Sequence, residues 1–346
     1  MTNNEKQVFD TKLKPSQDEN ALKEAAEYLK EGEIVAIPTE TVYGLAANAL
    51  NEEAVAKIYE AKGRPSDNPL IVHVCNMKMW GELVEEITED AKLLADKFWP
   101  GPLTIILPKS SKVPMKTTGG LDTVAVRMPS HKDTLRLIEL SNLPIAAPSA
   151  NLSGLPSPTT AEHCVRDLNG KIPLILDGGI CNVGIESTVV TLAGEKPVLL
   201  RPGKITAEEL SEALGKEVSI ASAVINPLKE GEKVSSPGMK YKHYSPKAKV
   251  ILVKGSLEGF KKKFEESPEG TYALVFSGEE KNFTKNTIPY GFEHDPDSQG
   301  RTIFALLREM DDLGAKLVLV RCPHEDEALG VYNRLIRAAA FKIEEV

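Results

Sequence analysis

The chain alternates between segments whose apolar residues recur every three or four positions and short apolar runs that predict strands. A helix is predicted for residues 18–32, because apolar residues recur at helical spacing: Ala21, Leu22, Ala25, Ala26 and Leu29. Gly32 is a signal for the end of this helix. The segment 51–63, "NEEAVAKIYEAKG", predicts a second helix, with Asn51 as its N-cap and Gly63 just past its end.

Short β-branched runs bounded by Gly, Pro or Asn predict the strands. Up to about Gly203 these runs are "EIVAI", "LIVHV", "LTIIL", "TVAVRM", "PIAAP", "PLILD", "STVVTL" and "PVLL". Helical stretches alternate with them, which indicates an α/β layer fold. Because "STVVTL" and "PVLL" follow each other closely, we expect part of the sheet to be antiparallel.

A second domain is predicted beyond an irregular segment. Residues 221–249 have no clear periodicity, and long stretches of this kind are usually linkers or functional loops. Between Pro227 and Lys249, six Lys stand against two Glu, a local excess of positive charge. Afterwards "VILV", "YALVF" and "KLVLV" alternate with helical stretches, which predicts a small Rossmann-like domain.

Length and charge narrow the possible functions. A chain of 346 residues is long enough for two domains. Its net charge of −8 argues against a general nucleic-acid coat, so any phosphate-binding surface must be local.

Cysteine usage and targeting signals indicate where the protein works. The 4 cysteines form no CxxC pair, which indicates neither a cysteine zinc site nor a disulfide framework, and reduced thiols are expected. The start of the chain lacks a signal peptide's apolar core and no long apolar run occurs, so we expect a cytoplasmic location without membrane contact.

Polar clusters follow several of the predicted strands, where α/β folds bind their ligands. The sequence has no GxxxxGK[ST], strand-associated GxGxxG, HExxH or GxSxG motif, so a nucleotide would be bound without the commonest phosphate loops. The first cluster is "IPTETVYGLAAN", in which Thr39, Glu40, Thr41 and Tyr43 precede Gly44. A turn capped by threonines is the alternative interpretation of that stretch.

Basic residues mark the second and third clusters. "AKGRPSDNPLIVHV" places Lys62 and Arg64 after a predicted helix, where they would either complement the helix dipole or clamp an anion. His73, taken alone, fits a half-buried structural histidine. Arg127 in "GLDTVAVRMP" lies within an apolar run and needs an anionic partner, which is either a structural carboxylate or a substrate carboxylate.

The remaining clusters, "PIAAPSANLSGLPSPT", "DGGICNVGIESTVV" and "LLRPGK", carry hydroxyl, amide and basic groups. Their polar residues are Ser149, Asn151, Ser153, Ser157, Ser187, Thr188 and Arg201. Each signal is modest alone, because turns rich in Ser and Asn are common. Together they predict one pocket for an anionic ligand with several phosphate or carboxylate groups.

These motifs, in this order, resemble the YrdC-type L-threonylcarbamoyladenylate synthases. The resemblance covers residues 15–205, and "SPGMKYKHYSP" followed by a small α/β domain is similar to the longer, two-domain form. It implies a YrdC-like twisted mixed sheet with flanking helices over 15–205, a helix and linker over 206–248, and a Rossmann-like domain over 249–346. The match over the last of these ranges is looser.

The resemblance also implies a reaction. L-Threonine, bicarbonate and ATP would give threonylcarbamoyl-AMP and pyrophosphate, with Mg²⁺ accompanying the nucleotide. Partner proteins would then transfer the threonylcarbamoyl group to the adenosine next to the anticodon of certain tRNAs. No side chain needs to act as a covalent nucleophile, because positioning and electrostatic stabilisation can carry the step.

Residue roles follow from the family's motifs. The nucleotide site, with Lys62 and Arg64 as the catalytic cations, maps to Lys62, Arg64, Asn68, Thr123, Ser149, Asn151, Ser157, Arg201 and Tyr241. The threonine site maps to Thr41, His73, Arg127 and Ser187. We further hypothesise that "GMKYKHYSP" closes over the phosphates as a basic, aromatic lid; the alternative is a solvated tether.

Two other function classes are possible. An RNA-binding module would use a concave, locally basic surface, but the net charge of −8 and the lack of aromatic residues interleaved with basic ones argue against it. Carbamoyl transfer from a different donor would normally require fused acylphosphatase and zinc modules, which the sequence does not contain. Weak RNA binding remains possible alongside synthase activity.

Overall fold

Helix boundaries in the computed structural model, which describes residues 8–226 and 244–346, follow the local signals in the sequence. Helix α1 (Glu19–Lys30) buries all five predicted apolar residues. Helix α2 (Glu52–Lys62) begins where the Asn51 side chain accepts hydrogen bonds from two backbone amides, and it ends at Gly63, which has a φ of 60°. Both helix predictions are confirmed.

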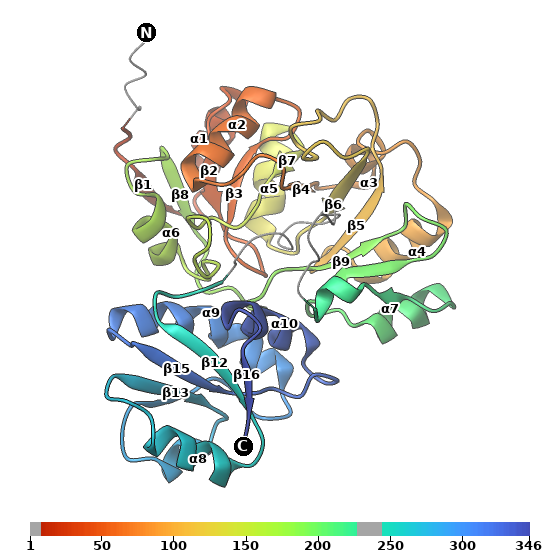
Figure 1. Cartoon of the computed structure of the whole chain (residues 1–346). Coiled ribbons are helices and arrows are strands. Elements are labelled where there is room, and N and C mark those ends of the chain that lie inside the picture. The colour runs from red at the N-terminus through yellow and green to blue at the C-terminus, as the bar shows by residue number, and fades with distance from the viewer. Residues whose placement is uncertain (1–7, 227–243) are drawn as a thin grey trace.

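The first unit is built on a twisted, mixed sheet of eleven strands (Figure 1). In spatial order these are β1 (Lys12–Pro15), β8 (Leu174–Asp177), β2 (Val35–Ile37), β3 (Gly44–Asn48), β7 (Ile145–Ala146), β4 (Ile71–His73), β6 (Thr123–Arg127), β5 (Leu103–Pro108), β9 (Thr188–Thr191), β10 (Val198–Arg201) and β11 (Ser219–Ile220). The predicted antiparallel pairing of β9 with β10 is confirmed.

Helices cover both faces of this sheet. They are α1, α2, α3 (Met77–Gly81), α4 (Glu89–Phe98), α5 (Lys132–Ser141), α6 (Ala161–Leu168) and α7 (Ala207–Leu214). Successive residues of a strand point to opposite faces, so Val35 packs with α1 and α5 whereas Ala36 belongs to the core under α2, α4, α6 and α7. A short 3₁₀ turn, Ser222–Val224, follows β11.

The second unit is a parallel sheet of five strands, which confirms the predicted Rossmann-like arrangement. Its order is β14 (Thr287–Pro289), β13 (Thr271–Val275), β15 (Leu317–Arg321), β12 (Lys249–Lys254) and β16 (Ile343–Glu345). The elements packed around it are α8 (Leu257–Glu265), the 3₁₀ turn Glu279–Asn282, α9 (Pro296–Asp312) and α10 (Leu329–Ala338). None of the helices in the described ranges is long and apolar enough to cross a membrane.

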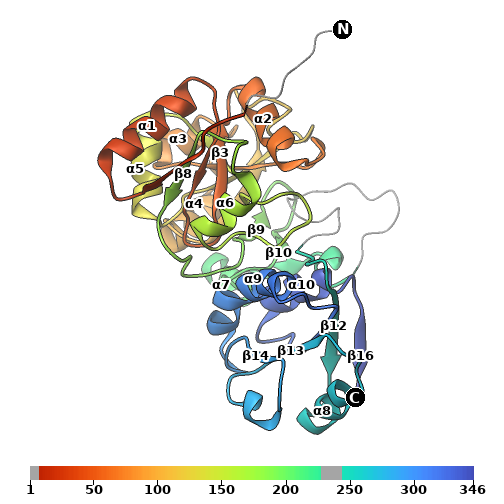
Figure 2. The ribbon, with the colours of Figure 1, turned by 90° about the vertical axis from the view of Figure 1, so that its left-hand side faces the viewer.

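Buried ion pairs join the two units, with α9 and α10 facing the first unit (Figure 2). Arg308 of α9 contacts Asp167 of α6 at 2.8 Å, and their side chains are 5% and 3% exposed. Arg334 of α10 donates to Glu186 at 2.7 Å, and its side chain is fully buried. Because a buried charge without its partner is costly, these contacts tie the position of one unit to the other.

Candidate functional site

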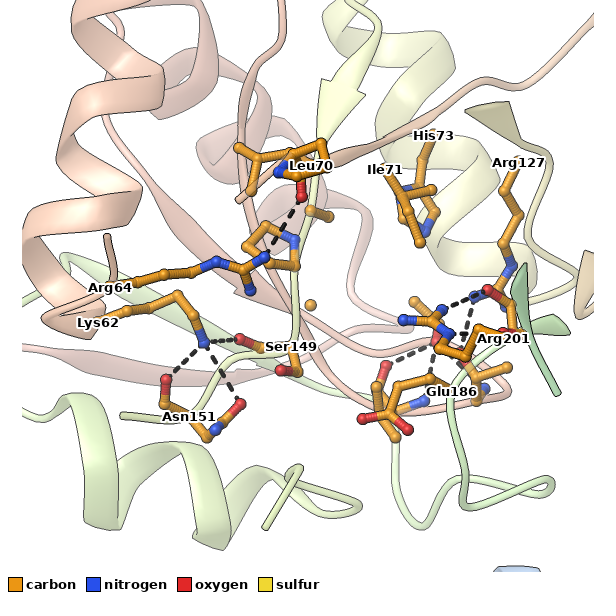
Figure 3. A pocket seen from close by; sticks show the side chains of 18 of the residues that line it. Lys62, Arg64, Leu70, Ile71, His73, Arg127, Ser149, Asn151, Glu186 and Arg201 are labelled. Carbon is orange, nitrogen blue, oxygen red and sulfur yellow. Dashed lines mark hydrogen bonds between the residues drawn. The ribbon is translucent and has the colours of Figure 1, made fainter. Parts of the chain in front are cut away.

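One cavity in the first unit collects most of the predicted site residues (Figure 3). The predicted residues that line it are Thr41, Lys62, Arg64, His73, Arg127, Ser149, Asn151, Ser187 and Arg201. They come from the ends of strands β4, β6 and β10, the end of α2, and the loops that join these elements. The sequence therefore located a single pocket by residues that lie far apart along the chain.

The stretch after β2 forms one wall of this cavity. The hydroxyls of Thr39 and Thr41 lie 2.8 Å apart, and Thr39 also donates to the backbone oxygen of Val42 at 2.6 Å. A side chain on Gly44 would come within 3.1 Å of the Ala147 side chain, so glycine allows the two backbones to approach. Tyr43 instead donates its phenol to the backbone oxygen of Gly179 and does not line the cavity.

Arg127 is held by groups from three directions. Its Nε donates to the backbone oxygen of Gly101 at 3.1 Å, and its Nη1 donates to the Thr41 hydroxyl at 2.8 Å. The sequence predicted either a structural or a substrate carboxylate as its anionic partner, and the structure places Glu40 Oε1 2.5 Å from Nη2. Neither Glu40 oxygen accepts a well-aligned hydrogen bond from the described residues, so proximity of opposite charges holds this pair. Glu40 is thus a structural partner behind the cavity wall.

His73 lies beside Arg127 because the parallel strands β4 and β6 pair these two residues in register. Burial, and then the charge of Arg127, lower the pKa of His73 to about 3. The imidazole is therefore neutral near pH 7. Its Nδ1 has no hydrogen-bond partner among the described residues, which leaves a polar atom for a ligand.

Lys62 anchors the loop that follows β7. Its Nζ donates to the backbone oxygen of Asn151 at 2.6 Å and also to the backbone oxygen of Ser149. Burial, and then the charge of Arg64, lower the pKa of Lys62 well below its ordinary value. Lys62 therefore acts on the shape of the loop that carries Ser149 and Asn151.

Two further guanidinium groups line the cavity. Arg64 donates from Nη2 to the backbone oxygen of Pro69 at 3.3 Å. Arg201 donates from Nε and Nη2 to the backbone oxygen and hydroxyl of Ser187, each at 3.0 Å. Burial lowers the pKa of Arg201 to about 10, so its charge persists at neutral pH. Figure 3 shows Lys62 and Arg64 on one side of the cavity, and Arg127 and Arg201 on the other.

Three predicted nucleotide contacts in the described residues do not line this cavity, and a fourth lies outside those residues. Thr123 stands at the start of β6, four residues before Arg127. Ser157 is buried and donates to Glu186 at 2.5 Å. Asn68 is fully buried, and neither atom of its amide has a partner among the described residues. Tyr241 and most of the hypothesised lid lie outside the described residues.

Two polar lining residues were not named as site residues from the sequence. Glu186 points to the cavity while its carboxylate accepts from Arg334 of the second unit. Burial would raise the pKa of Glu186, but the charges of Arg334 and Arg201 outweigh it and lower that pKa. Tyr244, just after the undescribed linker, also lines the cavity, and the Arg334 guanidinium lies 5.8 Å from its ring centre. Tyr244 belongs to the motif "GMKYKHYSP", and its place in that motif was the signal that could have marked it.

The cavity combines two cationic sides with a neutral imidazole and several hydroxyls. Such a site can hold two anionic groups close together, because the cations offset their repulsion. Its space is about 60 Å³, enough for a few water molecules, and the cavity is partly open to solvent.

Comparisons with known proteins agree on one family. The family model described as "Telomere recombination" (Sua5_yciO_yrdC) matches residues 27–203. A second model, "Threonylcarbamoyl-AMP synthase, C-terminal domain", matches residues 205–340.

Relatives match over almost the full length. The threonylcarbamoyl-AMP synthase of Pyrococcus abyssi is 47% identical, with 93% of this chain and 95% of the relative covered. That of Bacillus subtilis is 43% identical, with 95% of each chain covered. The crystal structure of P. abyssi Sua5 complexed with L-threonine is 46% identical and superimposes with a TM-score of 0.88, over 97% of this chain and 99% of the other.

Proposed function

We propose a mechanism from one premise: this chain belongs to the family of threonylcarbamoyl-AMP synthases in which a YrdC-type domain is joined to a C-terminal domain. It converts L-threonine, bicarbonate and ATP into threonylcarbamoyl-AMP and pyrophosphate. The product supplies the threonylcarbamoyl group for the adenosine next to the anticodon in tRNA. The observation that carries the mechanism is the cavity with Arg64 on one side and Arg127 on the other.

Threonine binds at the side formed by Arg127, Thr41, His73 and Ser187. The Arg127 guanidinium can receive the amino-acid carboxylate as a forked donor while Glu40 keeps its place behind the wall. His73, neutral because its pKa is lowered to about 3, can exchange a hydrogen bond with the substrate amine or hydroxyl without repelling a cation. These contacts would fix which atom of threonine faces the nucleotide.

ATP binds at the side formed by Arg64 and the loop that Lys62 anchors. Arg64 and Arg201 offset the negative charge of the phosphates, and Ser149 and Asn151 contribute polar groups from the loop. Asn68, Thr123, Ser157 and Tyr241 complete the proposed set of nucleotide contacts: the first three would reach the nucleotide only after local movement.

The reaction joins two anions. The amine of threonine combines with bicarbonate to give a carbamate and one water molecule, as a C–N bond replaces a C–O bond of bicarbonate. A carbamate oxygen then attacks the α-phosphate of ATP and displaces pyrophosphate. Arg64 and Arg201 lower the barrier by neutralising charge at the phosphates, and Arg127 and Thr41 hold the carbamate in line. No covalent link to the protein is formed.

Mg²⁺ fits this site only through the nucleotide. Among the described lining residues Glu186 is the one carboxylate, and Arg334 and Ser157 already hold it. Because Mg²⁺ requires several oxygen ligands, the phosphates and water would supply most of them. The ion would neutralise phosphate charge when bound.

Release of the product connects the enzyme to other proteins. An acyl phosphate anhydride of this kind is reactive in water, so proteins that transfer the threonylcarbamoyl group to tRNA would consume it in the cytoplasm. Any RNA binding by the chain itself would be weak, since its net charge is −8.

One assay tests the function. Purified protein is mixed with ATP, bicarbonate and each amino acid in turn, and pyrophosphate release is followed. The expected result is release that depends on threonine and on bicarbonate. Equal release with every amino acid, or RNA affinity without turnover, would overturn the assignment.

A further inference from the structure

Two histidines and two glutamates meet on the second unit, away from the active-site cavity. Glu293 and His294 lie between β14 and α9, and His324 and Glu327 lie between β15 and α10. Ligand atoms of Glu293, His294 and His324 all lie within 4.8 Å of one another. Both loops follow the carboxyl ends of parallel strands, the edge at which α/β sheets bind ligands.

The side chains of this cluster already contact one another. The two imidazole rings stack with their centres 4.9 Å apart and an angle of 14° between the planes. His294 Nδ1 lies 2.8 Å from a Glu327 oxygen, which leaves its Nε2 available, and a carboxylate on the second ring nitrogen is the usual support of a metal-binding histidine. His324 Nε2 lies 3.2 Å from a Glu293 oxygen.

A small tetrahedral ion would require one of the three ligands to move closer. Bonds of 2.0–2.2 Å place neighbouring ligand atoms roughly 3.4 Å apart. The pair formed by His324 and Glu293 is close to that spacing, so His294 is the residue that must approach. Its side chain is 67% exposed and can rotate without disturbing the core.

Electrostatics favour a cation at this place. The two glutamates bring two carboxylates to the cluster, whose negative charge a divalent cation would balance. His294 and Glu327 also line a cleft of about 940 Å³ between the two units, whose wall includes Asp295, Glu325 and Asp326. The two His–Glu contacts are solvent-exposed, and exposed pairs contribute little to stability. Stabilisation of the fold therefore does not explain why these four side chains lie together.

We propose that Glu293, His294 and His324 bind one divalent ion of the zinc class at the rim of this cleft, with Glu327 orienting His294. Imidazole with carboxylate suits Zn²⁺, whereas Mg²⁺ and Ca²⁺ prefer all-oxygen sites. Three protein ligands leave one position open toward the cleft, where water or an anionic group of a ligand can bind. The ion also clips together the loops that precede α9 and α10.

Calorimetric titration of the full, tag-free chain with ZnCl₂ after chelator treatment tests this site. We expect one zinc ion per chain, a higher melting temperature with zinc, and no comparable binding of MgCl₂. His324→Ala and Glu293→Gln are each expected to weaken zinc binding by about 10-fold or more. Replacing zinc by Co²⁺ should give the visible absorption of a tetrahedral site, which the same variants lose.

Three matched variants act as controls. Glu325→Gln removes a carboxylate from the same cleft, His131→Asn removes a histidine elsewhere, and Cys322→Ser removes the neighbouring thiol; all should keep zinc binding. Zinc affinity unchanged in the His294→Ala, His324→Ala double variant would overturn the proposal. So would no zinc binding by the parent chain, or loss of binding in Cys322→Ser.

Discussion

Arg127 illustrates how far single residues can be interpreted. An arginine within an apolar run had to have an anionic partner, and the structure supplies Glu40 at 2.5 Å. The sequence could not name that partner, since the two residues are brought together only by the fold. Glu186 was not predicted for the same reason: its partner, Arg334, belongs to the other unit. The residue type predicts that a buried charge has a partner, whereas the tertiary structure decides which residue that partner is.

Removing the carboxylate behind Arg127 should destabilise the first unit. Glu40→Gln leaves a buried guanidinium without its counter-charge, and we expect the free energy of unfolding to fall by about 3 kcal/mol. Glu19→Gln, which breaks the exposed pair with Arg136, should have little effect on that free energy. Urea denaturation measures both. Equal costs for the two variants would show that Glu40 does not compensate Arg127.

His73 predicts a particular dependence of stability on pH. Its pKa is lowered to about 3 in the folded chain, so below pH 6.5 the unfolded state binds a proton that the folded state does not. Stability should therefore decline as the pH falls from about 6.5 toward 3. His163, whose pKa is lowered to about 4, acts in the same window.

A variant separates the two histidines. His73→Asn removes one proton site and keeps His163, so the difference between variant and parent isolates His73. The parent should lose roughly 3 kcal/mol more than the variant between pH 7 and pH 4. Denaturant titrations across this range measure it, and parallel pH profiles would contradict the neutral, buried state of His73.

At the scale of elements, periodicity and end signals predicted the long helices and most buried strands. Helix α2 had both its cap and its terminal glycine in the sequence, and each acts as expected. Strand β3, Gly44–Asn48, was not predicted, because "GLAAN" contains no β-branched residue. Its extended conformation depends on pairing with β2 and β7. The short strands β1, β11, β14 and β16 were missed as well.

The contact between the end of α2 and the loop after β7 should control nucleotide binding. Lys62→Met removes the donor that holds the backbone oxygens of Ser149 and Asn151, so we expect a KM for ATP raised by about 10-fold or more. Lys57→Met alters the same helix at a half-buried pair with Glu33, away from the cavity, and should leave that KM unchanged. Steady-state pyrophosphate release measures both; an unchanged KM in Lys62→Met would refute the anchoring role.

At the scale of the whole molecule, alternation of strands and helices predicted two α/β units but not how they join. The sequence did not single out Arg308 and Arg334, and both are buried with partners in the first unit. Their partners could not be recognised without the fold. The shared cluster that contains Val42, Ile185 and Tyr244 likewise depends on both units.

Two salt bridges between the units offer a matched comparison. Arg308→Met breaks the buried pair with Asp167 and should lower the free energy of unfolding by about 3–5 kcal/mol. Arg166→Met breaks the exposed pair with Asp312 and should cost less than about 1 kcal/mol. Chemical denaturation followed by fluorescence tests this. If both variants unfold like the parent chain, the units are not held together by the buried pair.

The central claim is that one cavity binds threonine at Arg127 and ATP at Arg64. The most direct measurement is calorimetric binding of each substrate to Arg127→Ala and Arg64→Ala, beside the parent chain. Arg127→Ala should lose threonine binding by about 10-fold or more while ATP binding persists, and Arg64→Ala should show the reverse. Normal threonine binding by Arg127→Ala, or normal ATP binding by Arg64→Ala, would contradict the claim.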